Sequence, residues 1–190
     1  MRVITGTARG RKLKEPEGQD IRPTSGAVKE AIFNIIQFDT PGRRVLDLFA
    51  GTGQLGIEAL SRGARSCDFV DRSGAACKMI RENLAHCKLE GGRVYQMEAA
   101  RFLRRGDLYD LVFVDPPYDP VQMEKIIQNI LQFDILNKNG IMVCETREDT
   151  DMPEPEAPYA KLREYRYGKV KLTLYTRLLE SGEDRGGEGA

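Results

Sequence analysis

The sequence contains no tryptophan, a single histidine (His86) and only four cysteines. The cysteines form no C-x-x-C pair and no histidine cluster accompanies them, so we expect buried free thiols and no bound metal. The sequence also lacks a signal peptide and any apolar run long enough to cross a membrane, which predicts a cytoplasmic protein. Lysine plus arginine and aspartate plus glutamate both number 29, so net charge does not indicate a partner. A length of 190 residues suits one domain with a small appendage.

Charge is unevenly distributed along the chain. The first fourteen residues contain five basic side chains and no acidic one: Arg2, Arg9, Arg11, Lys12 and Lys14. Such a local basic patch is typical of contact with nucleic-acid phosphates. Loose apolar alternation with Gly6 and Gly10 predicts a small hairpin with residues 9–12 near its tip, although a solvated terminus is the alternative. Arg22 precedes a predicted helix, where a phosphate contact and a plain surface charge explain it equally well.

Strand and helix patterns alternate through the middle of the chain. Apolar residues recur at helical spacing from Val28 to Ile36, and Thr24 or Ser25 would cap this helix. Predicted strands follow at residues 44–49, 66–71, 93–97, 110–115 and 141–144, the last after a turn at Asn139-Gly140. Predicted helices between them cover residues 55–62, 73–87, 99–104 and 120–131. This alternation predicts an α/β fold, with a mostly parallel sheet and helices on both faces. The 110–115 run is nearly all apolar and is expected to be central.

The C-terminal part has a different pattern. Residues 149–158 are acidic and rich in proline, which predicts a loop. Residues 161–167 and 169–176 are β-like and meet at Gly168, so we expect an antiparallel hairpin closing one edge of the sheet. Residues 180–190 are rich in glycine and glutamate, and we expect them to be disordered. The predicted organisation is therefore a basic hairpin and helix at 1–40, a core at 41–179 and an acidic tail.

A glycine-rich turn follows the first predicted strand. Gly51, Gly53 and Gly56 satisfy the dinucleotide pattern G-x-G-x-x-G, and Asp71 lies twenty residues beyond Gly51. Asp47 argues against a dinucleotide, because a carboxylate at the end of this strand would repel a pyrophosphate. It suits an ammonium group instead, which S-adenosylmethionine carries together with a sulfonium and a ribose. A glycine turn that only joins strand to helix is the remaining explanation.

Four acidic residues lie at or just after predicted strand ends: Asp47, Asp71, Glu98 and Asp115. Ligands of open α/β sheets bind beyond the carboxyl ends of the strands, near the point where the strand order reverses. We therefore expect these four carboxylates to meet at one rim of the sheet. Each is also explained as a turn residue or a helix cap, and for Glu98 the two explanations are equally good.

The stretch Asp115-Pro116-Pro117-Tyr118 follows the predicted central strand. Two successive prolines fix the backbone and remove two amide donors, which leaves a carboxylate, carbonyls and an aromatic ring. Such a turn suits the exocyclic amine of a nucleobase. Hydrogen bonds to Asp115 and to the Pro116 carbonyl would hold the nitrogen in line with a methyl donor and stabilise the charge that develops. Tyr118 would stack on a base that is flipped out or presented from a loop. A rigid surface turn is the plainer alternative.

The stretch from Asp47 to Gly53, combined with residues 115–118, resembles the class I, S-adenosylmethionine-dependent amino-methyltransferases. Four further stretches resemble the RsmD-type enzymes in particular: residues 4–13, 22–24, 30–34 and 55–64. The resemblance covers residues 1–178 and implies a Rossmann-like fold with a seven-stranded sheet. It also implies methylation of the exocyclic N2 of one guanine in 16S ribosomal RNA, within a small-subunit particle, and we expect the protein to be a monomer.

The resemblance implies a role for each matching residue. The cofactor would contact Asp47, Phe49, Gly51, Thr52, Gly53, Asp71, Arg72, Glu98, Ala99 and Asp115. Among these, Asp47 and the glycines would hold the methionine part, Asp71 the ribose hydroxyls and the 98–99 backbone the adenine. The guanine would be held by Asp115, Pro116 and Tyr118. The candidate RNA contacts are Arg9, Arg11, Lys12, Lys14 and Arg22. Glu98 departs from the family pattern, because many relatives carry Asp or Asn there.

Three other functions compete with this interpretation. The first residue of the 115–118 turn is Asp, which does not by itself separate guanine N2 from adenine N6, so an enzyme acting on adenine N6 or cytosine N4 of DNA or another RNA is the nearest alternative. The basic N-terminus alone also permits an RNA-binding assembly factor without catalytic activity. The glycine spacing alone permits an NAD-dependent oxidoreductase, against which Asp47 argues.

Overall fold

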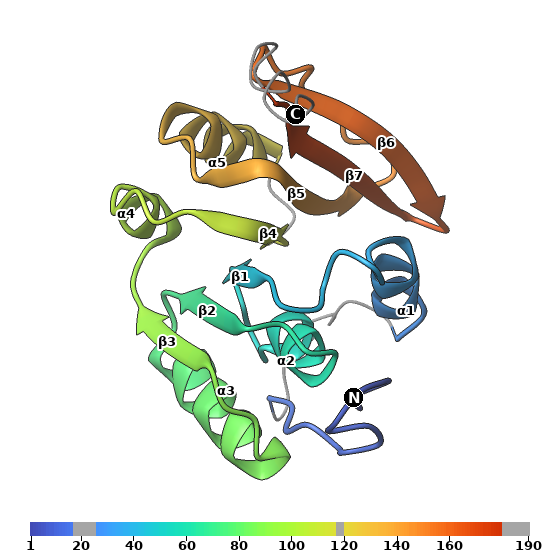
Figure 1. Ribbon diagram of the computed structural model, residues 1–190, viewed down its shortest axis with the longest axis vertical. Helices are drawn as coiled ribbons and strands as arrows, with labels where there is room; N and C mark the ends of the chain where they lie inside the picture. The colour runs from blue at the N-terminus through green and yellow to red at the C-terminus, as the bar shows by residue number, and fades with distance from the viewer. Residues whose placement is uncertain (17–25, 117–119, 180–190) are drawn as a thin grey trace, which may run out of the picture.

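The computed structural model of the chain describes residues 1–16, 26–116 and 120–179. These form a seven-stranded sheet in the order β3-β2-β1-β4-β5-β7-β6 (Figure 1). The strands are β1 (Arg44–Leu48), β2 (Ser66–Asp71), β3 (Gly92–Gln96), β4 (Tyr109–Val114), β5 (Leu136–Arg147), β6 (Tyr159–Tyr167) and β7 (Val170–Arg177). The helices are α1 (Gly26–Ile35), α2 (Gln54–Ser61), α3 (Gly74–Cys87), α4 (Ala99–Leu103) and α5 (Pro120–Gln132). Strand β7 runs antiparallel to β5 and β6, whereas β1 to β5 pair in parallel. The predicted fold class and the C-terminal hairpin are therefore confirmed.

Two apolar layers cover the two faces of the sheet. Side chains of a strand alternate between faces, so Val45 and Phe113 belong to one core cluster whereas Leu46 and Val112 belong to the other. Helices α1, α2 and α3 pack with the first cluster, and α4 and α5 with the second (Figure 1). Strand β4 occupies the fourth of seven positions and is buried along almost its whole length, which confirms that it is central.

Local sequence signals explain most element ends. The Ser73 hydroxyl accepts a hydrogen bond of 3.3 Å from the Ala76 amide and caps α3, as predicted. Helix α5 begins at Pro120, where a missing amide donor costs nothing. The caps expected for α1 at Thr24 and Ser25 lie outside the described residues. All four cysteines are buried free thiols, as predicted. No helix in the described part of the chain is long and apolar enough to cross a membrane.

Strand β5 differs from its prediction. We expected a turn at Asn139-Gly140 and then a strand from residue 141, but β5 already begins at Leu136 and contains that turn. Asn139 has a φ of 58°, and the pairing with β4 shifts register between Tyr109 and Leu111. The turn signal was therefore correct locally, but the backbone uses it as an irregularity within the strand because residues on both sides pair with β4.

The first sixteen residues form a minimal hairpin rather than two strands. Their backbone has a single bridge, between Arg2 and Lys12, supported by a 3.0 Å hydrogen bond from the Val3 amide to the Arg11 carbonyl. The Ile4 and Thr5 amides instead donate to the Glu58 carboxylate of α2, at 2.8 and 2.9 Å. The predicted hairpin exists, but α2 rather than a second strand satisfies much of its backbone.

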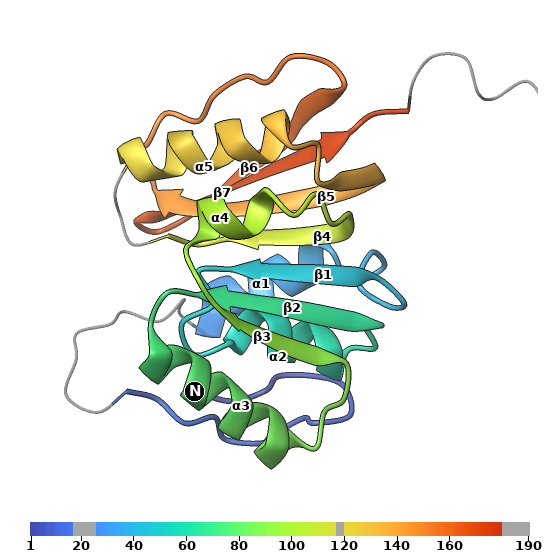
Figure 2. The ribbon, with the colours of Figure 1, turned by 90° about the vertical axis from the view of Figure 1, so that its left-hand side faces the viewer.

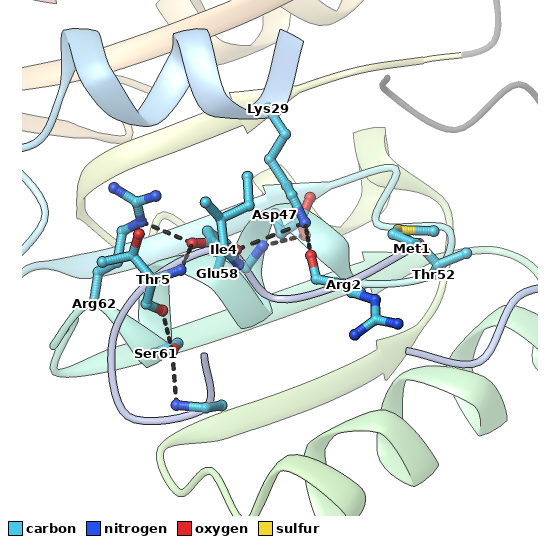
Figure 3. Close-up of polar contacts among 12 residues, drawn as sticks. Met1, Arg2, Ile4, Thr5, Lys29, Asp47, Thr52, Glu58, Ser61 and Arg62 are labelled. Atoms are coloured by element: carbon cyan, nitrogen blue, oxygen red, sulfur yellow. Dashed lines mark hydrogen bonds and ion pairs between the residues drawn. The ribbon is translucent and has the colours of Figure 1, made fainter. Parts of the chain in front are cut away.

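A buried charged cluster joins this hairpin to α1 and α2 (Figure 3). The Lys29 ammonium, on a residue only 1% exposed, donates to the Arg2 carbonyl at 2.7 Å and lies 3.6 Å from Glu58. Glu58 also accepts a 2.9 Å hydrogen bond from Arg62. Burial lowers the pKa of Lys29, and the neighbouring Glu58 carboxylate opposes that shift. The cluster fixes the N-terminal segment against the same face of the sheet that carries α2.

Candidate active site at the carboxyl ends of the strands

The turn from β1 into α2 repeatedly uses the left-handed backbone region. Gly51 and Gly53, with φ values of 53° and 77°, enter it at little cost, and Phe49 adopts it as well, with a φ of 65°. Gly56 serves a different purpose, because an added Cβ would lie 2.3 Å from the Phe69 ring of β2. Its hydrogen side chain lets α2 approach the sheet closely, the packing role that the third glycine of such a pattern has.

Asp47 lies beneath this turn. Its residue is 3% exposed, and its carboxylate accepts a 2.9 Å hydrogen bond from the Gly56 amide (Figure 3). Burial raises the pKa of Asp47 to about 8, the Gly56 hydrogen bond partly opposes this, and the carboxylates of Asp115 and Asp71 add to it. A cationic group would relieve that unfavourable burial, so the site is suited to an ammonium and unsuited to a pyrophosphate.

Asp71 closes the turn from the neighbouring strand. One carboxylate oxygen accepts from the Gly51 amide at 2.9 Å and the other from the Ser73 amide at 2.8 Å. The side chain is therefore fixed beside the turn and remains partly exposed at the rim. Arg72 follows it and is exposed, and Thr52 and Gly53 are buried within the turn.

Glu98 and Ala99 lie at the end of β3, at the same edge. Glu98 is the N-cap residue of α4, but its side chain makes no capping hydrogen bond and is exposed. A role as helix cap therefore explains where Glu98 stands in the backbone, but it does not explain why the side chain is a carboxylate. Ala99 is 5% exposed and packs into the core next to it.

The rim continues where β4 ends. Leu48 pairs with Val114, so the residues that follow them, Phe49 and Asp115, leave the sheet side by side. Asp115 is half-buried and Pro116 is buried. Pro117 and Tyr118 lie outside the described residues. A pocket of about 670 Å³ opens between the first turns of α5 and the loop after β5. It is lined by apolar, acidic and basic side chains, including Val121, Met123, Glu124, Arg147, Asp151 and Met152.

One buried side chain connects the glycine turn to the N-terminal segment. Asn83 of α3 is fully buried, and its amide nitrogen donates to the Thr52 carbonyl at 3.1 Å and to the Lys14 carbonyl at 3.3 Å. Its oxygen accepts from the Lys14 amide at 2.7 Å. Sequence reasoning missed this residue. The signal was available, because Asn83 falls between Ile80 and Leu84 on the buried face of a predicted helix.

The structure separates the candidate RNA contacts of the N-terminus: Arg9 and Arg11 lie away from this rim, whereas Lys14 lies near it, next to Asn83 and the glycine turn. The Thr7 amide donates to the carbonyl of Ser61, the last residue of α2, and the Arg11 guanidinium donates to the His86 carbonyl near the end of α3. Both helices start at the rim, so the turn of the N-terminal hairpin, with Arg9 and Arg11, lies at the opposite end of the sheet (Figure 2). Lys12 and Lys14 lie on the segment that returns from this N-terminal turn toward the rim, and Lys14 forms an ion pair with Glu82 at 2.8 Å. Arg22 lies outside the described residues.

Nowhere among residues 1–16, 26–116 and 120–179 do three or more His, Cys, Asp or Glu side chains gather as they would around a metal ion. The polar groups of the rim are instead a buried carboxylate, a second carboxylate next to the glycine turn, and a third beside a proline carbonyl. Together these groups suit a ligand with an ammonium and a ribose, next to a substrate that carries an amine.

Comparison with solved structures defines the class. The structure of yhhF from Escherichia coli superposes with a TM-score of 0.85 at 34% identity, covering 95% of this chain and 99% of that one. The sheet order, the glycine turn and the carboxylates at the ends of β1, β2 and β4 are those of a class I, Rossmann-like fold of S-adenosylmethionine-dependent methyltransferases.

Sequence comparison identifies the family within that class. The family described as Conserved hypothetical protein 95 matches residues 1–176. YlbH of Bacillus subtilis is 38% identical over 182 residues, covering 93% of this chain and 99% of YlbH. Ribosomal RNA small subunit methyltransferase D of Escherichia coli is 33% identical over 185 residues, covering 97% and 93%. The chain therefore belongs to this family, the RsmD family, which confirms the resemblance seen in its motifs.

Proposed function

We propose that this protein transfers a methyl group from S-adenosylmethionine to the exocyclic N2 of a guanine in 16S ribosomal RNA, within a small-subunit particle in the cytoplasm. The observation that carries the proposal is the pairing of Leu48 with Val114, which brings the Asp47 turn and Asp115 together at one rim. The name of one relative, Ribosomal RNA small subunit methyltransferase D of Escherichia coli, supports ribosomal RNA as the substrate.

Each half of the rim has a distinct part in this proposal. The cofactor would lie against the glycine turn, with Asp47 near its ammonium and Asp71 beside its ribose. Phe49, Thr52, Arg72, Glu98 and Ala99 complete the proposed cofactor contacts. When bound, S-adenosylmethionine supplies an electrophilic methyl group on its sulfonium.

Asp115 and the Pro116 carbonyl would orient the substrate amine. The nitrogen lone pair is delocalised into the base, so the amine is a poor nucleophile until N–H hydrogen bonds localise it. Transfer would break the bond between sulfur and methyl, form the bond between nitrogen and methyl, and release one proton from nitrogen. The Asp115 carboxylate would accept a hydrogen bond from that N–H and is the proposed first acceptor of the proton. Tyr118 would stack on the guanine.

The test uses labelled S-adenosylmethionine and small subunits that lack the modification, with the native protein and an Asp115→Ala variant. We expect label in RNA, recovered after digestion as N2-methylguanosine, and almost none with the variant. Recovery of N6-methyladenosine or N4-methylcytidine would reject the guanine assignment. Label on naked RNA or DNA but not on subunits would reject the particle. Cofactor binding without any transfer would favour a binding factor.

A further inference from the structure

The rim has a second flank on the β5–β7–β6 side of the sheet, the side away from β2 and β3. Strand β6 runs parallel to β5, because both pair antiparallel with β7, so the turn after β6 lies at the same edge as Asp115. Figure 2 shows this turn on the same side of the molecule as the start of α5. We call residues 165–169 the hairpin tip; they are Tyr165, Arg166, Tyr167, Gly168 and Lys169.

The hairpin tip combines exposed cations with an exposed aromatic ring. Arg166 and Lys169 are exposed, and neither forms an ion pair with another described residue. Tyr167 is 37% exposed, whereas Tyr165 packs against the core and carries the Arg163 guanidinium over its ring at 6.0 Å. The β6–β7 ladder holds these side chains on a fixed support, and the Glu148 amide donates to the Lys169 carbonyl at 3.0 Å.

The hairpin tip is close enough to Asp115 to meet the same RNA strand. Val114 is level with Cys144 in β5, and Arg147, three residues further, is level with Val170 at the start of β7. Three residues along a strand span about 10 Å, and the three strand spacings from β4 to β6 span about 14 Å. Arg147, whose side chain is 63% exposed, lies between the two points and lines the pocket beside α5.

We propose that the hairpin tip binds the single-stranded RNA that flanks the target guanine. Arg166 and Lys169 contact phosphates, and Tyr167 stacks on a neighbouring base. This inference rests on the proposed RNA substrate and adds a surface that neither the basic N-terminus nor residues 115–118 provide.

Neighbouring acidic side chains limit where the phosphates lie. Arg147 pairs with Asp149 at 3.2 Å, and Glu124 and Asp151 line the same pocket. Carboxylates repel a phosphate but accept hydrogen bonds from base N–H groups. The backbone of the RNA therefore follows the hairpin tip, while the pocket is left to base edges.

The test compares two variants with matched charge changes. One is Arg166→Ala combined with Lys169→Ala, and the other is Arg65→Ala combined with Arg104→Ala, which removes two exposed cations just before β2 and just after α4, at the opposite end of the sheet. For each we measure KM and kcat for unmodified small subunits at two salt concentrations, and the Kd for S-adenosylmethionine by calorimetry. The hairpin-tip variant is expected to raise KM about tenfold or more and to reduce the salt slope by about 1.4, since each single-strand phosphate contact contributes about 0.7. Its Kd for the cofactor should stay unchanged.

The variant of Arg65 and Arg104 is the control and is expected to change KM less than threefold. A hairpin-tip variant with native KM and native salt slope overturns the inference, whatever the control variant does. A hairpin-tip variant with weakened cofactor binding also overturns it, because the effect would then be structural. If the native protein methylates no subunit RNA at all, the proposed function itself fails, which is a different result.

A second pair of variants isolates the aromatic ring. Stacking on one base contributes an amount equivalent to roughly 5- to 150-fold in affinity. We therefore expect Tyr167→Ala to raise KM at least about fivefold and Tyr167→Phe, which keeps the ring, to leave KM near the native value. Equal effects of the two variants would exclude stacking.

Discussion

The half of the rim that we propose for the cofactor, called the cofactor half, is internally connected, whereas the half that we propose for the substrate, called the substrate half, is open. At the ends of β1 and β2, Asp47 holds the Gly56 amide and Asp71 holds the Gly51 and Ser73 amides, so the carboxylates and the turn fix one another. At the ends of β5 and β6, Arg147 is largely exposed and pairs with an equally exposed Asp149, and the hairpin tip presents Arg166 to solvent.

This difference matches the ligand that we propose for each half. A small cofactor with many rotatable bonds is bound more tightly by a site that is already in its binding conformation. A ribosomal RNA strand brings its own structure and is held mainly by phosphate contacts, which tolerate mobile side chains. We therefore expect changes in the cofactor half to alter cofactor affinity, and changes in the substrate half to alter turnover or KM.

The largest expected effect is on turnover. Asp115→Asn keeps one acceptor oxygen but removes the charge that faces the developing positive charge on nitrogen. We expect kcat to fall about 10²- to 10³-fold, as for loss of one transition-state hydrogen-bonding group. The Kd for S-adenosylmethionine, measured by calorimetry, should change less than tenfold. A comparable loss of cofactor affinity would mean that the two halves are not separate.

The next largest effect is on cofactor affinity. Asp47→Asn preserves the shape of the side chain and an acceptor for the Gly56 amide, but removes the carboxylate beneath the turn. Loss of a buried charge partner predicts a rise in the Kd for S-adenosylmethionine of about 10²-fold or more. Adenosine, which lacks the ammonium, is the control ligand and should bind both proteins equally. A parallel loss of adenosine binding would show that the turn had collapsed.

The cofactor half was predictable from sequence because its signals are local. The glycines and Asp47 occur within ten consecutive residues, and Asp71 ends a strand of clear pattern. Because the strands are parallel, their carboxyl ends lie at the same edge of the sheet, so no other contact is needed to predict that these residues meet. The strand ends at Asp71 and the cap at Ser73 matched the structure for the same reason.

The other features of the fold depend on contacts between residues far apart in the chain, which sequence spacing does not predict. Lys29 and Glu58 are charged residues on helices, and only the packing of α1 against α2 and the hairpin makes them a buried pair. The position of the N-terminal tip depends on Ser61, more than fifty residues away. The 137–140 irregularity in β5 depends on pairing with β4 on both sides of a turn signal.

A smaller effect should reveal how the N-terminal segment supports the cofactor half. Asn83→Leu removes the donor to the Thr52 carbonyl and both hydrogen bonds to Lys14. We expect the Kd for S-adenosylmethionine to rise about tenfold, equivalent to about 1.4 kcal/mol and to the loss of one or two buried hydrogen bonds. Ser61→Ala is the matched control. It loosens the same segment by removing hydrogen bonds with Ala8 and Thr5 at the far end of α2, and it should leave the Kd unchanged.

If Ser61→Ala weakens cofactor binding as much as Asn83→Leu, the segment acts through general stability. A melting temperature measured for both variants decides whether they are equally destabilised. The KM for subunits is a second readout, because a loss confined to the glycine turn should not change it.

The last expected effect is on the pH dependence of stability, and it leaves ligand binding and turnover aside. Asp47 has a pKa of about 8 in the folded protein, against a usual value of 3.8. Between those values the folded state retains a proton that the unfolded state has lost, so this residue makes the free energy of unfolding fall as pH rises. The slope for one proton is at most about 1.4 kcal/mol per pH unit, and it disappears above the folded pKa.

Asp47→Asn removes the titration. The free energy of unfolding of the ligand-free variant, measured with urea, should therefore fall less steeply between pH 5 and pH 8, and the variant should be the more stable protein at pH 8. Saturating S-adenosylmethionine should flatten the native curve in the same window, because its ammonium favours the ionised carboxylate. Identical slopes for the native protein and the variant would show that Asp47 is already ionised in the empty site, and that the site does not depend on a ligand to balance its charge.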